Sequence, residues 1–228
     1  MESLHLQKPV NNFPASYPWY KKWGANITYY LSSIPLWPRK NALYSDDIAS
    51  IYITIRTGDI ILVWNFRHLS WLFIEWSVTH ALVYMGRWKC IHAYAHGVSY
   101  IGIRKICRSY DTCIILRPRW RDDSQLMDFC THIVSQLWKP YDFFFWTDQE
   151  NTTFFCTRLI NDSLQKVAYD SWFNSIREAK NIVDSLFDSS FRGHRILQPE
   201  EMAYGNFDVV FISHNIDCRD GKYRLISK

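Results

Sequence analysis

Short apolar runs separated by turn signals are the dominant feature of this chain. Gly58-Asp59 is a turn signal, and the β-branched run that follows it is typical of a buried strand. Gly86-Arg87 separates two further runs and predicts a hairpin turn. The predicted strands are Ile60–Phe66, Thr79–Met85, Trp88–Ala95, Thr112–Leu116, Asp208–Ser213 and Lys222–Ile226. Runs this short, joined by tight turns, favour an antiparallel sheet.

Helical spacing appears in three later segments of the chain. Asp123–Leu137 places Leu126, Phe129 and Ile133 on one face, which is the pattern of an amphipathic helix. Thr153–Ala168 and Ser171–Phe187 are predicted to be helical as well, and Ser70–Trp76 to be a short apolar helix or loop. We therefore predict an α+β domain, with an antiparallel sheet and the helices packed on one side.

Residues 1–45 differ in composition from the rest. They contain five of the eight prolines and a high density of Trp and Tyr. Proline interrupts regular structure, whereas aromatic side chains favour a surface to cover. We predict an extended arm that packs on the body, with one short helix near Asn26–Leu31, and a single domain over residues 46–228. An interfacial membrane anchor is the alternative interpretation of the arm.

The overall composition limits the classes of partner and cofactor. A net charge of +4 does not resemble the clustered basic footprint of a nucleic-acid-binding protein, and Arg117, Arg119 and Arg121 are predicted to lie in a solvated loop. No apolar stretch approaches the ~18 residues that span a bilayer, and no secretory signal is seen. The six cysteines form no C-x-x-C pair, so a structural zinc site has little support, whereas disulfides remain possible. We expect an intracellular, cytoplasmic protein without a metal or cofactor.

Cys156 is the candidate nucleophile. Asn151, Thr152 and Thr153 are suitable N-cap residues, which would place Cys156 in the first turn of an apolar helix. The positive end of a helix favours a thiolate over a thiol and would lower the pKa of the sulfur. The alternative is a small apolar side chain in the core, which is how most free cysteines behave.

Two histidines on neighbouring predicted strands are candidates for its partners. His80 opens the strand Thr79–Met85 and could serve as the base that a cysteine nucleophile needs. A symmetric two-residue turn would pair residue 81 with His92 and place the two imidazoles roughly side by side, so that His92 could orient His80. A surface role for His80, and a metal pair formed by His92 and His96, are the competing interpretations.

The order of these parts resembles that of a known family. The matching segments are Thr57–Ile61, Thr79–Val83, Ile91–Ala93 with Gly97-Val98, Lys139–Phe143 and Phe155–Ile160. The chain resembles the circularly permuted papain-like amidases of the NlpC superfamily, specifically the YiiX/YaeF-like branch, which has a poxviral member. The resemblance covers about half of the chain, residues 55 to 165. Each motif is weak alone, but all five occur in the family's order, with the histidine first and the cysteine late.

The resemblance implies a circularly permuted papain-like fold and a role for each matched residue. Cys156 would be the nucleophile, His80 the base and His92 the polar third member, with Tyr141 near the site to bind substrate or stabilise an oxyanion. A backbone N–H near Cys156 would supply a further oxyanion donor. Two positions depart from the family pattern. His92 stands where permuted members often have Glu, and Arg158 stands where the family usually has Glu, which bears on any substrate contact there.

The implied reaction is acyl transfer through a thioester on Cys156. We expect a cysteine hydrolase, amidase- or peptidase-like, acting on an amide-type bond of a peptide or lipid. A lipid acyltransferase or thioesterase using the same three residues is the first alternative, because the triad does not fix the substrate. A catalytically inactive binding or structural protein with this fold is the second. Peripheral membrane contact through the N-terminal arm is compatible with each of them.

Overall fold

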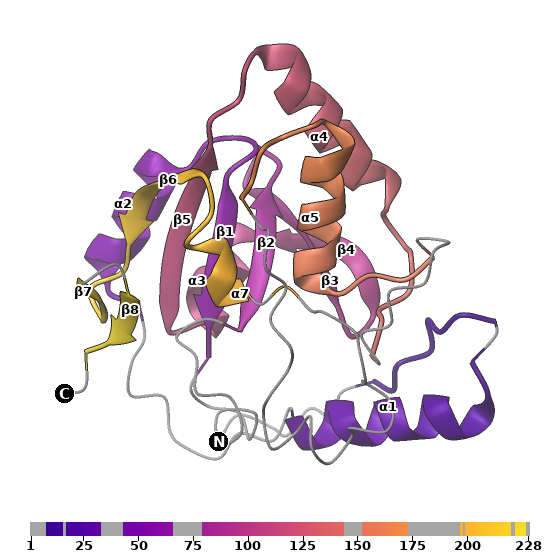
Figure 1. The fold of residues 1–228 in the computed structure, drawn as a ribbon. Helices are drawn as coiled ribbons and strands as arrows, with labels where there is room; N and C mark the ends of the chain where they lie inside the picture. The colour runs from indigo at the N-terminus through magenta and orange to yellow at the C-terminus, as the bar shows by residue number, and fades with distance from the viewer. Residues whose placement is uncertain are drawn as a thin grey trace.

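A six-stranded antiparallel sheet forms the centre of the protein (Figure 1). The computed structural model describes residues 8–15, 17–32, 43–65, 79–143, 152–172, 197, 199–219 and 222–226. In the sheet the strand order is β4-β3-β2-β1-β5-β6, and β7 and β8 form a separate two-stranded ribbon. The strands are β1 Ile60–Trp64, β2 His80–Tyr84, β3 Lys89–Tyr94, β4 Gly97–Gly102, β5 Thr112–Pro118, β6 Phe207–Ile212, β7 Ile216–Arg219 and β8 Lys222–Leu225. The helices are α1 Trp19–Ser32, α2 Ser45–Thr54, α3 Ile103–Ser109, α4 Asp123–Ser135, α5 Cys156–Lys166 and α7 Pro199–Met202.

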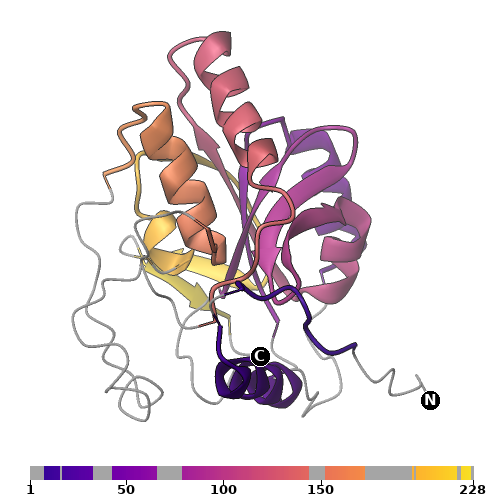
Figure 2. The same ribbon diagram turned by 90° about the vertical axis from the view of Figure 1, so that its right-hand side faces the viewer.

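Both faces of the sheet are covered, because the central strands are apolar on both sides. Ile60, Leu62 and Val83 face a core that includes residues of α4 and α5. Ile61 and Leu82 face a second core that includes residues of α2 and α3. The prediction that the helices pack on one side is therefore wrong. A strand buried on both faces reads as a continuous apolar run rather than an alternating one, and it needs a helical layer on each face (Figure 2).

Most of the predicted elements within the described residues are confirmed, including all six predicted strands and the helix α4. The sequence analysis missed the strands β4 and β7 and the helices α2, α3 and α7. Gly97 and Gly102 at the two ends of β4 argued against a strand there, yet β4 pairs with β3 over the full length of both strands. The predicted helices in Ser70–Trp76 and in most of Ser171–Phe187 fall outside the described residues.

A buried ion pair fixes the turn that precedes β1. Arg117 on β5 donates through Nε and Nη2 to the two carboxylate oxygens of Asp59, at 2.9 and 2.8 Å, and the Asp59 side chain is buried. Gly58 has φ of +88°, and a Cβ there would lie 2.4 Å from a side-chain carbon of Leu126. The turn therefore requires glycine at position 58. Because Arg117 pairs with the buried Asp59 of the same turn, its role is structural. Arg119, by contrast, forms an exposed pair with Asp208.

The N-terminal arm contains a longer helix than the sequence suggested. α1 extends over Trp19–Ser32, whereas the predicted helix was confined to Asn26–Leu31. The preceding segment contacts the body, because Asn12 Nδ2 donates to the carbonyl oxygens of His96 and Trp138. In the part of the chain that the structure describes, no helix combines the length and the apolar character needed to cross a membrane.

Candidate active site

Cys156 is the first residue of α5, which begins three residues later than predicted. The N-cap is Phe155, which offers no side-chain hydrogen bond, and not Thr152 or Thr153 as predicted; the third predicted cap, Asn151, lies outside the described residues. The preceding backbone is extended instead, because the N–H of Phe154 bonds to Pro140 and the N–H of Asp142 bonds to Phe154. These two bonds form a short parallel bridge between Tyr141 and Phe154. Helix α5 begins two residues after the bridge, at Cys156.

Three backbone N–H groups are directed at the sulfur of Cys156. They belong to Ala81 on β2, to Thr157 and to Cys156 itself, and each of them lowers the pKa of the thiol. Burial has the larger effect and raises it, so the net pKa lies above the ordinary value. The expectation of a lowered pKa is therefore wrong for the resting site, because the loss of solvent outweighs the donors at the helix N-terminus.

The N–H of Ala81 is available because β2 and β3 separate at this end. Their ladder consists of Val83 with Ile91 and Tyr84 with Cys90, although both strands continue beyond it. In an antiparallel strand every second N–H points to the same neighbour. The N–H of Met85 bonds to Lys89 on the β3 side, so the N–H of Ala81, four residues earlier, points to that side too. There it meets the sulfur of Cys156 in place of a β3 carbonyl.

The two histidines form a buried hydrogen-bonded pair. His80 Nε2 lies 2.9 Å from His92 Nδ1, and each side chain is 7% exposed. The register differs by one residue from the prediction, because Val83 pairs with Ile91, which places Leu82 rather than Ala81 opposite His92. A one-residue shift exchanges the two faces of a strand. The observed register puts His80 and His92 on the same face, as diagonal neighbours, whereas the predicted one would have separated them.

Both imidazoles are held neutral. Burial, and then the proximity of His92, keep the pKa of His80 well below its usual range. Burial, and then Lys105, lower the pKa of His92 to about 4. A neutral imidazole has one N–H, so the bond between the rings uses one hydrogen. If His80 donates it from Nε2, the Nδ1 of His80 is an unprotonated acceptor that can receive the thiol proton.

Two tyrosines that the sequence analysis did not select enclose this pair. The ring of Tyr94 stacks on His92 at 5.8 Å and meets His80 edge-on at 5.7 Å. Tyr110 lies parallel to His80 at 6.1 Å, and the Cys156 thiol is close enough to raise its pKa further, after burial. Tyr94 could have been found, since it follows His92 by two residues on the same strand face. Tyr110 follows α3, which no sequence signal connected to the site.

Tyr141, which the resemblance implies for substrate binding, is close enough to Cys156 for the thiol to affect its pKa. It forms the bridge with Phe154, and its pKa is raised well above the usual range by burial and then by the neighbouring Cys156 thiol and Asp142. With its pKa raised, the hydroxyl stays neutral and can donate a hydrogen bond. Arg158, at the position of reversed charge, is buried and forms an i,i+4 pair with Asp162 on its own helix.

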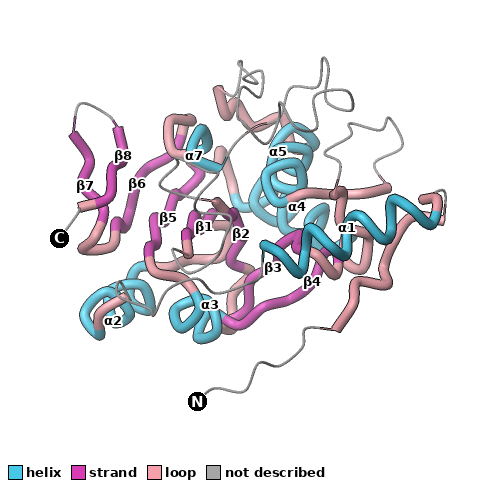
Figure 3. Tube along the Cα trace, turned by 90° about the horizontal axis from the view of Figure 1, so that it is seen from below, coloured by secondary structure: helices cyan, strands magenta, loops and turns pink. Residues whose placement is uncertain are grey.

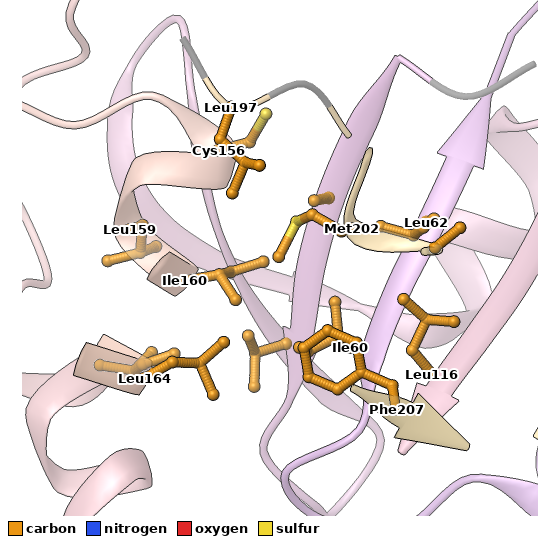
Figure 4. Packing of buried hydrophobic residues seen from close by; sticks show 14 of the residues in the cluster. Ile60, Leu62, Leu116, Cys156, Leu159, Ile160, Leu164, Leu197, Met202 and Phe207 are labelled. Carbon is orange, nitrogen blue, oxygen red and sulfur yellow. The ribbon is translucent and has the colours of Figure 1, made fainter. Parts of the chain in front are cut away.

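The N-terminal half of α5 is held by packing and by one buried hydrogen bond. Ile160 extends from the helix toward Met202, and Cys156 stands at the start of the same helix beside Leu197 (Figure 4). The hydroxyl of Thr157 donates to the carbonyl oxygen of Leu197 at 2.6 Å. The residue that follows the nucleophile therefore ties the helix start to a segment 40 residues away.

The residues considered as metal ligands are directed to different partners. His92 bonds to His80, whereas His96 Nε2 lies 3.4 Å from the hydroxyl of Tyr29. Among the described residues, no group of three or more His, Cys, Asp or Glu side chains could hold a metal ion. All six cysteines are free, so the possibility of disulfides that the sequence left open is not realised.

Comparison with known proteins adds one distant similarity. No protein-family model matches the chain, and no curated protein matches it. One solved structure to which it is similar is that of the metalloprotein YiiX from Escherichia coli O157:H7. The two chains are 16% identical, with a TM-score of 0.48, over 64% of this chain and 87% of that one. This similarity is too low to support any assignment of function, so the candidate site is interpreted from its own geometry.

Proposed function

We propose that the protein is a cysteine-dependent acyl hydrolase with a permuted papain-like arrangement of Cys156, His80 and His92. The observation that supports it best is the buried bond between the two histidines, together with the N–H of Ala81, next to His80, which is directed at the sulfur of the cysteine that opens α5. A cysteine nucleophile, a base and a group that orients the base are the three parts of a catalytic triad. Here the third part is an imidazole, whose Nδ1 would accept from His80 Nε2 in the tautomer that leaves Nδ1 of His80 unprotonated.

The reaction starts from a neutral thiol and a neutral imidazole. As the sulfur attacks the acyl carbonyl, the thiol proton moves to Nδ1 of His80, and a new carbon–sulfur bond forms. His80 then donates that proton to the leaving amine or alcohol, and the bond to the leaving group breaks. Water attacks the thioester with His80 as base, which releases the acid and restores the thiol. His92 keeps His80 in the tautomer that the first step requires.

The donors around the sulfur suit the charge that develops in this reaction. The N–H groups of Ala81 and Cys156 converge on the sulfur, so an oxyanion on the attacked carbon would lie next to them. We expect the hydroxyl of Tyr141 to be a further donor, because the Cys156 thiol is close enough to affect its pKa. Because these donors recognise only the acyl carbon and its oxygen, they suit an amide, an ester or a thioester equally.

The amide-type bond stays the first substrate hypothesis, and a lipid acyltransferase or thioesterase the first alternative. An inactive binding protein is the remaining alternative. A buried pair of neutral histidines is costly to keep in a core that needs only packing, because apolar side chains of similar volume would avoid the desolvation. That cost favours a catalytic role for the pair.

Trapping of the acyl-enzyme tests the proposal directly. The protein is incubated with short-chain amides, p-nitrophenyl esters and acyl thioesters, and intact mass spectrometry measures acylation. We expect an acyl adduct on Cys156 that hydroxylamine removes, no adduct in Cys156→Ala, and slower acylation in His80→Gln. Cys218→Ala is the matched control, because Cys218 is exposed and lies outside the site. Equal acylation of Cys156→Ala and wild type would refute the assignment of the nucleophile.

A further inference from the structure

One side of α1 is a continuous aromatic face exposed to solvent. At 100° per residue, its members fall within one narrow arc of the helix. Trp19 is 78% exposed and Trp23 is 67% exposed, which is unusual for side chains of this size. The aromatic face consists of Trp19, Tyr20, Trp23, Ile27 and Tyr30.

The opposite side of α1 attaches the helix to the body. Ala25 and Tyr29 are buried, and Tyr29 belongs to a small core with Val10 and Ala95. Asn26 holds the preceding segment, since its side chain accepts from the N–H of Val10 and donates to its carbonyl. The helix is thus fixed to the protein by one side, and the aromatic face points outward.

The net positive charge of the protein lies in the same part of the sequence. Residues 1–45 contain five basic residues and one acidic residue, Glu2, whereas the other 183 residues contain 21 of each. α1 itself carries Lys21 and Lys22 and no acidic residue. At 100° per residue Lys22 flanks the aromatic face next to Trp19, whereas Lys21 lies toward the attached side, with its Nζ over the ring of Tyr17. A basic arm with an exposed aromatic face complements a surface that is apolar underneath and negatively charged at its rim.

α1 also lies next to the candidate active site. The ring of Tyr29 contacts Tyr94 edge-on at 6.3 Å, and Tyr94 contacts both His80 and His92. The views in Figures 1 and 3 agree that α1 lies across the end of β3 and β4. The turn at Trp88 joins the other ends of β2 and β3, away from the two histidines.

We propose that the aromatic face of α1 binds the surface of a membrane that contains anionic lipids. Trp and Tyr favour the boundary between headgroups and acyl chains, where the ring is buried and its polar atom stays hydrated. Lys22, at the flank of the face, interacts with the headgroups, and Lys21 adds to the positive charge of the arm; a basic side chain near an anionic surface contributes about 1 kcal/mol, or roughly fivefold in binding. The bound protein then presents the end of the sheet that carries the histidine pair to the membrane. The inference is independent of the chemistry at Cys156.

Vesicle co-sedimentation tests this inference. The full chain is mixed with phosphatidylcholine vesicles that contain about 30% phosphatidylglycerol, a composition chosen to give a clear negative surface potential. We expect binding that weakens at high salt, that falls at least tenfold in the double variant Trp19→Ala/Trp23→Ala, and that falls about tenfold or more in Lys21→Glu/Lys22→Glu. Trp88→Ala is the matched control, because Trp88 is also exposed but lies at the other end of the sheet.

Three outcomes would overturn the proposal, and none of them bears on the acyl-enzyme test. The first is equal binding of the Trp19→Ala/Trp23→Ala variant and wild type. The second is binding that Trp88→Ala weakens as much as the double variant does. The third is a dimer in size-exclusion chromatography that the double variant dissociates, which would assign the aromatic face to a second copy of the chain. Binding that persists in Cys156→Ala would support the proposal even if no acyl adduct forms.

Discussion

The neutral histidine pair should make the stability of the protein fall as the pH falls. In the unfolded chain His92 takes up a proton near its ordinary pKa of 6.5, whereas in the folded protein it does so only at about 4. Below pH 6.5 the unfolded state therefore binds more protons than the native state, and the free energy of unfolding decreases until about pH 4. The pKa of His80 is also lowered, so it contributes in the same direction.

The size of the effect follows from the pKa of His92. A fall from 6.5 to about 4 corresponds to about 3 kcal/mol of stability that is present above pH 6.5 and lost by strongly acidic pH. Between pH 7.5 and pH 5 the loss from this residue is about 2 kcal/mol. Replacement by asparagine removes the titrating group, so His92→Asn should lose about 2 kcal/mol less than wild type over the same interval.

Urea denaturation at the two pH values measures the difference. Tyr94→Phe is the control, because it keeps both imidazoles and should retain the pH dependence of the wild type. A wild type and a His92→Asn variant with the same pH dependence would refute the assignment of a neutral, buried His92. A wild type that gains stability toward pH 5 would show instead that the pair is protonated in the native state.

Three further predictions concern the nucleophile and the elements that hold it. Because burial raises the pKa of Cys156, the rate of its labelling by iodoacetamide should still increase with pH at pH 9. A preformed thiolate–imidazolium pair would instead give a rate that reaches a plateau near neutral pH. Peptide mass spectrometry at several pH values measures the rate at this cysteine. Arg117→Ala leaves Asp59 buried without its cation and should lower the free energy of unfolding by about 3 kcal/mol in urea denaturation. Arg119→Ala removes an exposed pair and should leave the urea midpoint nearly unchanged. Thr157→Val removes a buried hydrogen-bond donor and should lower the free energy of unfolding by about 1 to 3 kcal/mol, and an unchanged urea midpoint would contradict this.

Local pattern was sufficient to predict six of the strands. The apolar runs gave the strands because periodicity and turn residues act over a few neighbouring positions. The assignment of Cys156, His80 and His92 depended on residue type, on the expected strands and on the family resemblance. In the structure the two histidines are bonded to each other, and the N–H of Ala81, the residue next to His80, is directed at the sulfur of Cys156.

What only the tertiary structure decided depends on distant residues and on burial. The register of β2 and β3 was set by the true length of their turn, which the sequence misjudged by one residue. Whether the pKa of Cys156 is raised or lowered depended on burial. The packed chain excludes solvent from the thiol, and this raises the pKa by more than the N–H groups at the helix N-terminus lower it. Tyr110 and the N–H of Ala81 reach the site only because strands and helices far apart in sequence converge there. A sequence pattern determines which elements form, whereas burial and the separation of β2 from β3 determine the environment of the thiol and the imidazoles.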